Sequence, residues 1–190
     1  LVIRGPVGGG VHAGPFHSQN PEAWFCHAPG LKVVAPATAR DAKGLIKSAI
    51  RDNDPVLFLE HKALYRRIKE DIPDSDYTIP LAEAAVYRPG SDLTIITYAA
   101  MVYVALEAAQ TLGKEGISAE IIDLRTLSPL DETSLLASVR KTSRVIVLHE
   151  DTLTGGLGAE IAARIAERAF EDLDAPVLRI AAPDLSLIHI

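Results

Sequence analysis

The sequence predicts an α/β protein made of two mostly parallel, three-layer domains. Short apolar runs of strand length alternate along the chain with segments whose apolar residues recur every three to four positions. A polar stretch rich in Pro and Asp interrupts this alternation between residues 65 and 80. We therefore expect one domain over residues 1–64, a linker over 65–80 and a second domain over 81–190.

In the first half, strands are expected over residues 1–4, 32–35 and 55–59. Thr38, followed three positions later by Asp41, resembles a capping box, which predicts that a helix begins there. The apolar residues of that helix recur on one face, as expected for packing on a sheet: Ala42, Leu45, Ile46, Ala49 and Ile50.

In the second half, strands are expected over residues 93–98, 119–122, 145–148 and 177–180. A helix with apolar residues from Val102 to Leu112 ends at the glycines that follow it. Ser128 and Pro129 predict the N-cap and first residue of the next helix. A last helix is expected over residues 158–170. Strands that alternate with helices in this way favour parallel pairing.

Composition excludes several classes of function. The net charge is −6 and the chain has no basic run, which argues against a nucleic-acid partner. The single cysteine, Cys26, cannot form an internal disulfide and is typical of a reducing compartment. There is no apolar run of membrane-spanning length, so we expect no membrane partner. Because Leu1 lies inside an expected strand, we also expect that the start of the fold is missing.

A glycine-rich loop follows the first strand and carries His17. Residues 5–19 contain five glycines and two prolines, so the backbone can approach a ligand closely. Loops at the ends of strands are where α/β proteins place their chemistry. His17 is therefore a candidate proton carrier or ligand clamp, with a surface or structural histidine as the alternative on spacing alone.

Three other segments could have a function, but each also has a purely structural interpretation. The glycines of residues 154–158 suit either a phosphate cradle or close packing of a helix on a sheet, and packing is favoured. Residues 49–55 combine a helix end with carboxylates, which suits a hard cation or an ordinary polar turn, with the turn as the default. Residues 60–62 and 65–67 are interpreted as a solvated basic face.

Several motifs together resemble one family. Phe16-His17-Ser18-Gln19, followed by residues 21–25 and 29–34, resembles the β chain of the thiamine-diphosphate-dependent decarboxylating component of 2-oxo acid dehydrogenase complexes. The resemblance continues through residues 41–46, 49–55, 123–126, 141–142 and 173–176. It implies the second half of a pyrimidine-binding domain followed by a transketolase C-terminal-like domain.

The resemblance also implies roles for individual residues. His17 matches the active-site histidine that lines the funnel to the cofactor and helps proton transfer while an acyl group passes to a lipoyl group. A structural potassium site matches four residues, Ala49, Ile50, Asp52 and Asp54. Asp174 matches a position that contacts the subunit-binding domain of the acyltransferase core.

In such enzymes thiamine diphosphate is shared between two chains, with magnesium on the α side. The implied assembly is an α2β2 heterotetramer that serves a lipoyl-bearing dihydrolipoyl acyltransferase core, in the bacterial cytoplasm or the mitochondrial matrix. The β-side glutamate of the cofactor site is expected before Leu1, so no residue of this chain is assigned to cofactor binding. We expect the isolated chain to be inactive and to self-associate at a sheet edge near residues 1–4. The last six residues resemble nothing in the family, and His189 is given no role.

The substrate implied by the resemblance is a branched-chain 2-oxo acid of the 2-oxoisovalerate type. Residues 58–62, 65–66 and 149–156 favour it over pyruvate or acetoin, which remain alternatives. Two readings from other classes also remain open. One is a transketolase-like ketol transferase, and the other is a non-catalytic docking or nucleotide-sensing module.

Overall fold

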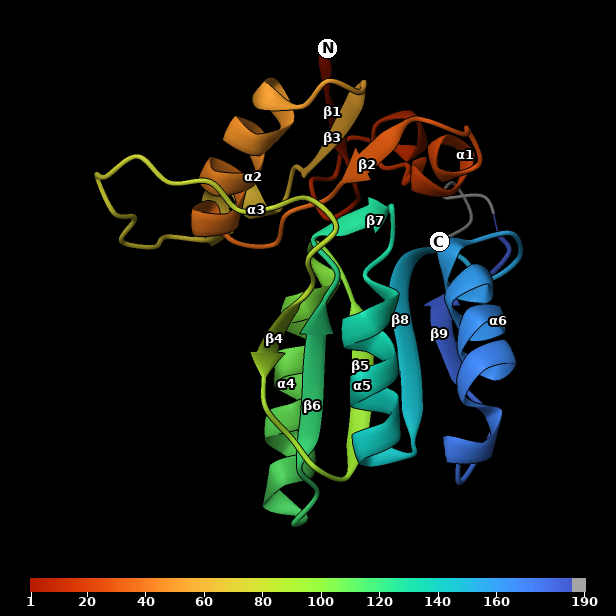
Figure 1. Cartoon of the computed structure of the whole chain (residues 1–190). Helices are drawn as coiled ribbons and strands as arrows, with labels where there is room; N and C mark the ends of the chain where they lie inside the picture. The colour runs from red at the N-terminus through yellow and green to blue at the C-terminus, as the bar shows by residue number, and fades with distance from the viewer. Residues whose placement is uncertain (186–190) are drawn as a thin grey trace.

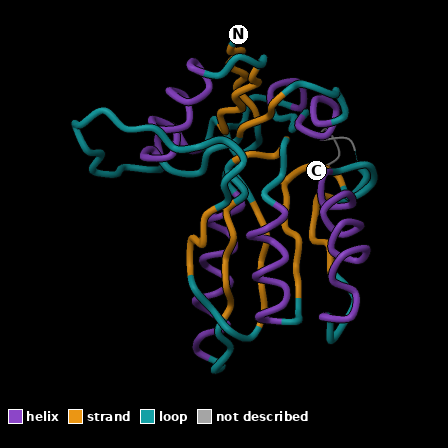
Figure 2. Tube along the Cα trace, in the orientation of Figure 1, coloured by secondary structure: helices purple, strands orange, loops and turns teal. Residues whose placement is uncertain are grey.

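The computed structural model describes residues 1–185, in which two β-sheets lie one above the other (Figure 1). Figure 2 shows the helices that cover them and the long loop that connects the two halves. The predicted α/β class with mostly parallel strands is confirmed. The expectation for His189 and the rest of residues 186–190 lies outside the described residues.

The first sheet has the strand order β1-β3-β2-β7. Its strands are β1 (Val2–Val7), β3 (Val56–His61), β2 (Lys32–Val34) and β7 (Thr126–Ser128). The first three are parallel, and β7 joins β2 in the antiparallel direction. Since β7 comes from the second half of the chain, the two halves share this sheet.

Helix α2 (Ala39–Arg51) covers one face of the first sheet. Its buried Leu45 and Ala49 pack on Val34, Val56 and Phe58. The predicted cap is confirmed, because Thr38 Oγ1 accepts a hydrogen bond from the Asp41 N–H at 3.0 Å. The opposite face of the sheet packs on the short helix α1 (Glu22–Cys26) and on the core of the second half.

The second sheet has the order β4-β6-β5-β8-β9. Its strands are β4 (Ala85–Arg88), β6 (Ala119–Asp123), β5 (Leu93–Thr97), β8 (Val145–Thr152) and β9 (Leu178–Ala182), and only β4 pairs antiparallel to its neighbour. Helix α4 (Met101–Lys114) covers one face, and α5 (Glu132–Thr142) and α6 (Leu157–Ala169) cover the other. The parallel strands point toward the first sheet (Figure 1), so their carboxyl ends lie at the boundary between the two domains.

The predicted start of α5 is wrong. Ser128 ends β7 in extended backbone, and its hydroxyl donates to the Leu31 carbonyl at 3.3 Å. The helix begins at Glu132 with Asp131 as its N-cap, because the Asp131 carboxylate accepts the Ser134 N–H at 3.0 Å. It also accepts the Ala84 N–H at 3.0 Å, and this contact ties the helix start to the linker end. Pairing with β2 draws Ser128 into the sheet and leaves the cap to the next acidic residue.

The polar stretch between the domains packs on α2. It contains the short helix α3 (Leu64–Arg67), and then Asp76 pairs with Lys47 at 2.6 Å. Tyr77 donates to the Arg40 carbonyl at 2.9 Å. Gly44 faces this segment, and a Cβ there would lie 2.6 Å from Ile79. The linker is therefore held against the first domain, which needs a glycine at the contact.

The remaining short elements are two 3₁₀ helices, η1 (Pro15–His17) and η2 (Phe170–Asp172). Over residues 1–185, no helix combines the length and apolar character that crossing a bilayer requires.

Candidate functional site

His17 lies on the surface, in the loop that leaves the carboxyl end of β1. It ends η1, and both it and Phe16 are exposed. The two rings meet edge to face, with centroids 5.2 Å apart. The Lys62 ammonium donates to the His17 carbonyl. An open pocket of about 540 Å³ lies beside the imidazole, and its walls are Pro6, Val7, Ala13, Phe16, Gln19, Pro21 and Lys62.

The loop closes at its base through backbone hydrogen bonds. The Gly8 N–H donates to the Gln19 carbonyl at 3.0 Å, and the Lys62 N–H donates to the Val7 carbonyl at 3.0 Å. Gly8 has a φ of 85°, and a Cβ there would lie 2.1 Å from Nε2 of His61. Both the left-handed backbone and the close approach of the ring therefore require glycine at this position.

A partly buried histidine–glutamate pair lies under the start of the loop. Nε2 of His61, at the end of β3, is 2.5 Å from Oε2 of Glu150 in β8. Oε1 of Glu150 accepts the Gly9 N–H at 3.0 Å. Burial raises the pKa of the Glu150 carboxyl, but hydrogen bonds from His61, Gly9 and Asn20 outweigh it and hold that pKa below its ordinary value. Glu150 is thus an anion that joins the two domains and the loop.

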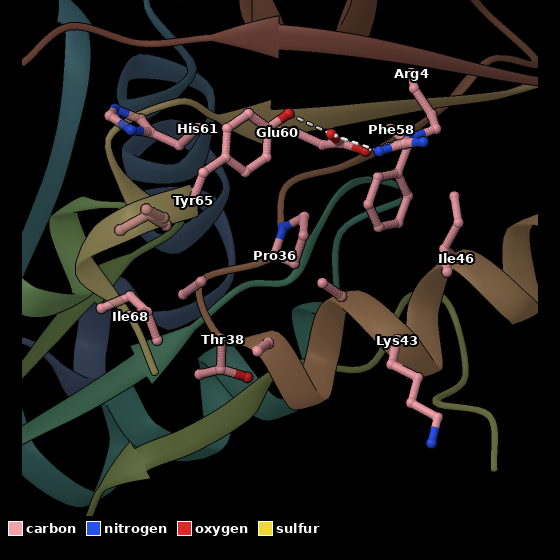
Figure 3. A pocket seen from close by; sticks show the side chains of 14 residues that line it. Arg4, Pro36, Thr38, Lys43, Ile46, Phe58, Glu60, His61, Tyr65 and Ile68 are labelled. Atoms are coloured by element: carbon pink, nitrogen blue, oxygen red, sulfur yellow. Dashed lines mark hydrogen bonds and ion pairs between the residues drawn. The ribbon is translucent and has the colours of Figure 1, made fainter. Parts of the chain in front are cut away.

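The interpretation of residues 60–62 and 65–67 as a solvated basic face holds only for residues 65–67, which are exposed, and is wrong for residues 60–62. His61 is 5% exposed. Glu60 forms an ion pair with Arg4, with contacts of 2.5 and 2.9 Å, and accepts a hydrogen bond from Tyr65 (Figure 3). These groups line one side of a pocket of about 450 Å³ whose other walls, including Pro36, are mostly apolar. The pairing of β1 with β3 places Arg4 opposite Phe58, two residues from Glu60. The long Arg4 side chain reaches the Glu60 carboxylate, and the two charges neutralise each other.

A second polar contact holds the far end of the loop. Glu22, the first residue of α1, is 2% exposed and accepts a hydrogen bond from the Tyr98 hydroxyl at 2.7 Å. Burial raises the pKa of the Glu22 carboxyl to about 7, although the hydrogen bond from Tyr98 opposes this effect. Burial also raises the pKa of the Cys26 thiol to about 12. The cysteine is therefore a thiol at neutral pH rather than a reactive thiolate.

The glycines at the start of α6 serve packing, as predicted. A Cβ at Gly156 would lie 2.6 Å from the ring of His149, and one at Gly158 would lie 2.5 Å from it. His149 is 2% exposed, and burial lowers its pKa to about 4, with a further contribution from Arg179. A neutral, buried ring under two glycines is part of the contact between β8 and α6, so it is not a proton carrier at neutral pH.

The residues of the expected potassium site lie at the carboxyl end of α2. The Asp52 carboxylate contacts the Lys32 ammonium at 2.6 and 2.8 Å, and Asp54 contacts the same ammonium at 3.1 Å. The Ala49 carbonyl accepts the Asp52 N–H at 3.4 Å, and the Ile50 side chain is exposed. The arrangement gathers oxygen atoms at one helix end, where the ammonium of Lys32 in β2 already pairs with both carboxylates.

Asp174 lies near the start of β8, whereas Glu150 lies near the carboxyl end of that strand. Its N–H donates to the Ser143 carbonyl at 2.8 Å, and its carboxylate is 3.4 Å from the guanidinium of Arg144. Both charged side chains are more than half exposed. The Asp174 carboxylate is therefore accessible to a partner, far along the strands from the loop that carries His17.

Sequence reasoning missed the polar groups that join the domains. Besides Glu22 and Tyr98, Asp41 forms a bidentate pair with Arg125, with contacts of 2.8 and 3.1 Å. Asp123 is fully buried beside it, and burial raises its pKa to about 7. The available signal was positional, because polar residues stand at the carboxyl ends of several expected parallel strands. Within residues 1–185, no group of three or more His, Cys, Asp or Glu side chains is arranged to hold a metal ion.

Comparisons with known proteins agree with this architecture. Residues 1–68 match the transketolase pyrimidine-binding domain, and residues 82–190 match the transketolase C-terminal domain. A solved structure described as a split gene transketolase, inactive beta4 tetramer, superposes with a TM-score of 0.77 at 27% identity, over 97% of this chain and 57% of that one.

Curated relatives are more similar in sequence. The chain is 51% identical to the 2-oxoisovalerate dehydrogenase subunit beta of Bacillus subtilis and 54% identical to the pyruvate dehydrogenase E1 component subunit beta of the same organism, in each case over 97% of this chain and 57% of the relative. It is 52% identical to the mitochondrial 2-oxoisovalerate dehydrogenase subunit beta 2 of Arabidopsis thaliana, over 51% of that protein. The chain thus spans little more than half the length of these relatives. It belongs to the transketolase family, with a pyrimidine-binding domain followed by a C-terminal domain, and within that family it is similar to the β subunits of 2-oxo acid dehydrogenases.

Proposed function

We propose that this chain is part of the β subunit of a thiamine-diphosphate-dependent 2-oxo acid dehydrogenase, and that His17 moves a proton while an acyl group passes to a lipoyl group. The observation that carries this proposal is the position of His17, exposed beside an open pocket on a loop whose base is fixed by hydrogen bonds. An imidazole changes its charge between pH 5 and 8, which suits it to proton transfer.

The cofactor would supply the carbanion that adds to the 2-oxo carbonyl and allows carbon dioxide to leave. His17, with the pocket beside it, would supply an accessible base at the surface where a lipoyl group would bind. The described residues offer no set of carboxylates for magnesium beside a diphosphate. We therefore assign that end of the cofactor to an α chain, in an α2β2 assembly.

The test of the proton-transfer role uses the complete β subunit that contains this sequence, assembled with its α chain. His17→Asn should lower turnover with a lipoyl acceptor by about 10²- to 10⁴-fold, the usual loss for an acid–base group. His12→Asn is the matched control, since His12 is exposed in the same loop and has a φ of 56°, which asparagine tolerates. Near-normal turnover of the His17 variant would refute the assignment.

For the substrate, we propose a branched-chain 2-oxo acid. Support comes from residues 58–62 and 149–156, which resemble branched-chain enzymes. Relatives named for 2-oxoisovalerate and for pyruvate have similar identities, so the comparison favours neither. Competition between 2-oxoisovalerate and pyruvate for the assembled enzyme is the experiment, and a higher kcat/KM for pyruvate would overturn the choice.

Two further contacts belong to this proposal. The carbonyls of Ala49 and Ile50, with the carboxylates of Asp52 and Asp54, would hold potassium beside the Lys32 ammonium. Asp174 would contact the acyltransferase core through its exposed carboxylate. Asp174→Asn should therefore weaken binding of the assembled enzyme to that core and leave decarboxylation unchanged, whereas unchanged binding would exclude this contact.

A ketol transferase is the second candidate, because the superposed structure is described as a split gene transketolase. Its chemistry would use a sugar phosphate donor rather than a lipoyl acceptor. Turnover of the assembled enzyme with a ketose phosphate, in the absence of any lipoyl acceptor, would favour this candidate.

A further inference from the structure

The loop that carries His17 belongs to the first domain, but both of its ends are held by side chains of the second. At its start, the Gly9 N–H donates to Glu150 in β8 at 3.0 Å. At its end, Glu22 accepts the Tyr98 hydroxyl at 2.7 Å. Tyr98 directly follows β5. The residues between these two contacts include the exposed His17.

The two holding residues come from neighbouring strands. β5 and β8 pair in parallel, with Ile96 opposite Val147. Two positions further on, Tyr98 is level with His149, so Glu150 is one position beyond it. Both strands point toward the first domain (Figure 1). One edge of the second sheet thus presents a hydroxyl donor and a carboxylate acceptor to the two ends of a single loop.

The contact between Tyr98 and Glu22 is buried, and the contact between Gly9 and Glu150 is partly buried. Tyr98 is 5% exposed and Glu22 is 2% exposed, so water cannot replace either partner at low cost. His61 supports the Glu150 carboxylate from the other side at 2.5 Å and fills the space that Gly8 leaves open. The loop itself is rich in glycine, and without such contacts it would sample many conformations.

We propose that Tyr98 and Glu150 are positioning residues that fix the His17 loop from the second domain. Their catalytic importance rests on the proposed function of His17, but their effect on the loop does not. In this arrangement, a substitution at Tyr98 or Glu150 in the second domain changes the position of His17 in the first domain, although neither residue contacts His17. Neither residue contacts the pocket beside His17.

The experiment has a structural arm on the 190-residue chain. Tyr98→Phe and Glu150→Ala should each raise amide hydrogen exchange over residues 8–21 by about 3- to 10-fold, the value of one net hydrogen bond. Glu150→Gln should restore slow exchange, because its amide oxygen can still accept the Gly9 N–H. Tyr103→Phe is the matched control. It removes a tyrosine hydrogen bond between the domains, from Tyr103 to the Ala37 carbonyl at 3.0 Å, without touching the loop.

A kinetic arm uses the complete β subunit assembled with its α chain. Tyr98→Phe and Glu150→Ala should lower kcat with a lipoyl acceptor by about 10-fold with little change in KM, and Glu150→Gln should recover most of the loss. In a His17→Asn background the same substitutions should have no further effect. This coupling distinguishes a loss of positioning from a general loss of stability.

Faster exchange in the two variants but not in the Tyr103 control, together with the kinetic coupling, supports the inference. Exchange that stays at the control level overturns it, and so does faster exchange with unchanged kcat in an enzyme whose turnover His17→Asn lowers. The turnover of His17→Asn alone reports on the proposed function, so the failure of one idea can be told from the failure of the other.

Discussion

Glu22 gives a direct test of the electrostatics at the domain boundary. Its carboxyl is 2% exposed, and burial raises its pKa to about 7 from an ordinary value of 4.5. Between these values the folded chain holds a proton that the unfolded chain releases. The free energy of unfolding therefore falls as the pH rises from 4.5 to 7, and the loss is complete above 7.

The magnitude follows from the two pKa values. At 1.36 kcal/mol per pKa unit, the difference between 4.5 and about 7 corresponds to about 3 kcal/mol. Glu22→Gln removes this titration but keeps an oxygen that can accept the Tyr98 hydroxyl. Asp123 is also buried with a raised pKa, and since it is present in both proteins its effect cancels in the comparison.

The assay is urea unfolding of the wild type and of Glu22→Gln, followed by circular dichroism between roughly pH 4.5 and pH 8. Across this pH range, the free energy of unfolding of the wild type should fall by about 2–3 kcal/mol more than that of the variant. Parallel curves of unfolding free energy against pH for the two proteins would mean that the pKa of Glu22 is not raised. So would a carboxyl carbon signal of Glu22 that titrates near its ordinary value.

Three further predictions use matched substitutions. Gly8→Ala should lower the free energy of unfolding by about 2–5 kcal/mol, because the added methyl group clashes with the buried His61 ring and the φ is unfavourable. Gly14→Ala has the unfavourable φ but open space, and should lower it by about 1–2 kcal/mol. Equal losses in chemical denaturation would contradict this prediction. Asp131→Ala removes the N-cap of α5 and should lower the free energy of unfolding by about 1 kcal/mol or more, whereas Ser128→Ala should lower it less. The reverse order would support Ser128 as the N-cap, as predicted from the sequence. Melting midpoints should be higher in potassium than in sodium chloride at equal ionic strength, and Asp52→Asn should abolish the difference; identical midpoints for the wild type would mean that the segment is only a turn.

Features that depend on neighbours along the chain could be predicted before the fold was known. The apolar spacing predicts the buried face of α2, and the pattern of Thr38 and Asp41 predicts its cap. The absence of a side chain at Gly156 and Gly158 predicts close packing of α6 on the sheet. The placement of His17 in a surface loop also follows from the sequence, because glycines after a strand predict such a loop. These signals survive folding because helix and strand periods are set by the backbone.

Which distant groups meet depends on how the two sheets are assembled. Strand pairing brings Glu150 to His61 and the Tyr98 hydroxyl to Glu22, and it draws Ser128 into the first sheet so that Asp131 caps α5. No pattern along the chain carries this information, because each contact depends on the order of the strands in a sheet and on the approach of two sheets. The physical reason is that a buried polar group must find a partner wherever the fold places one, and that partner is chosen by packing rather than by distance in sequence.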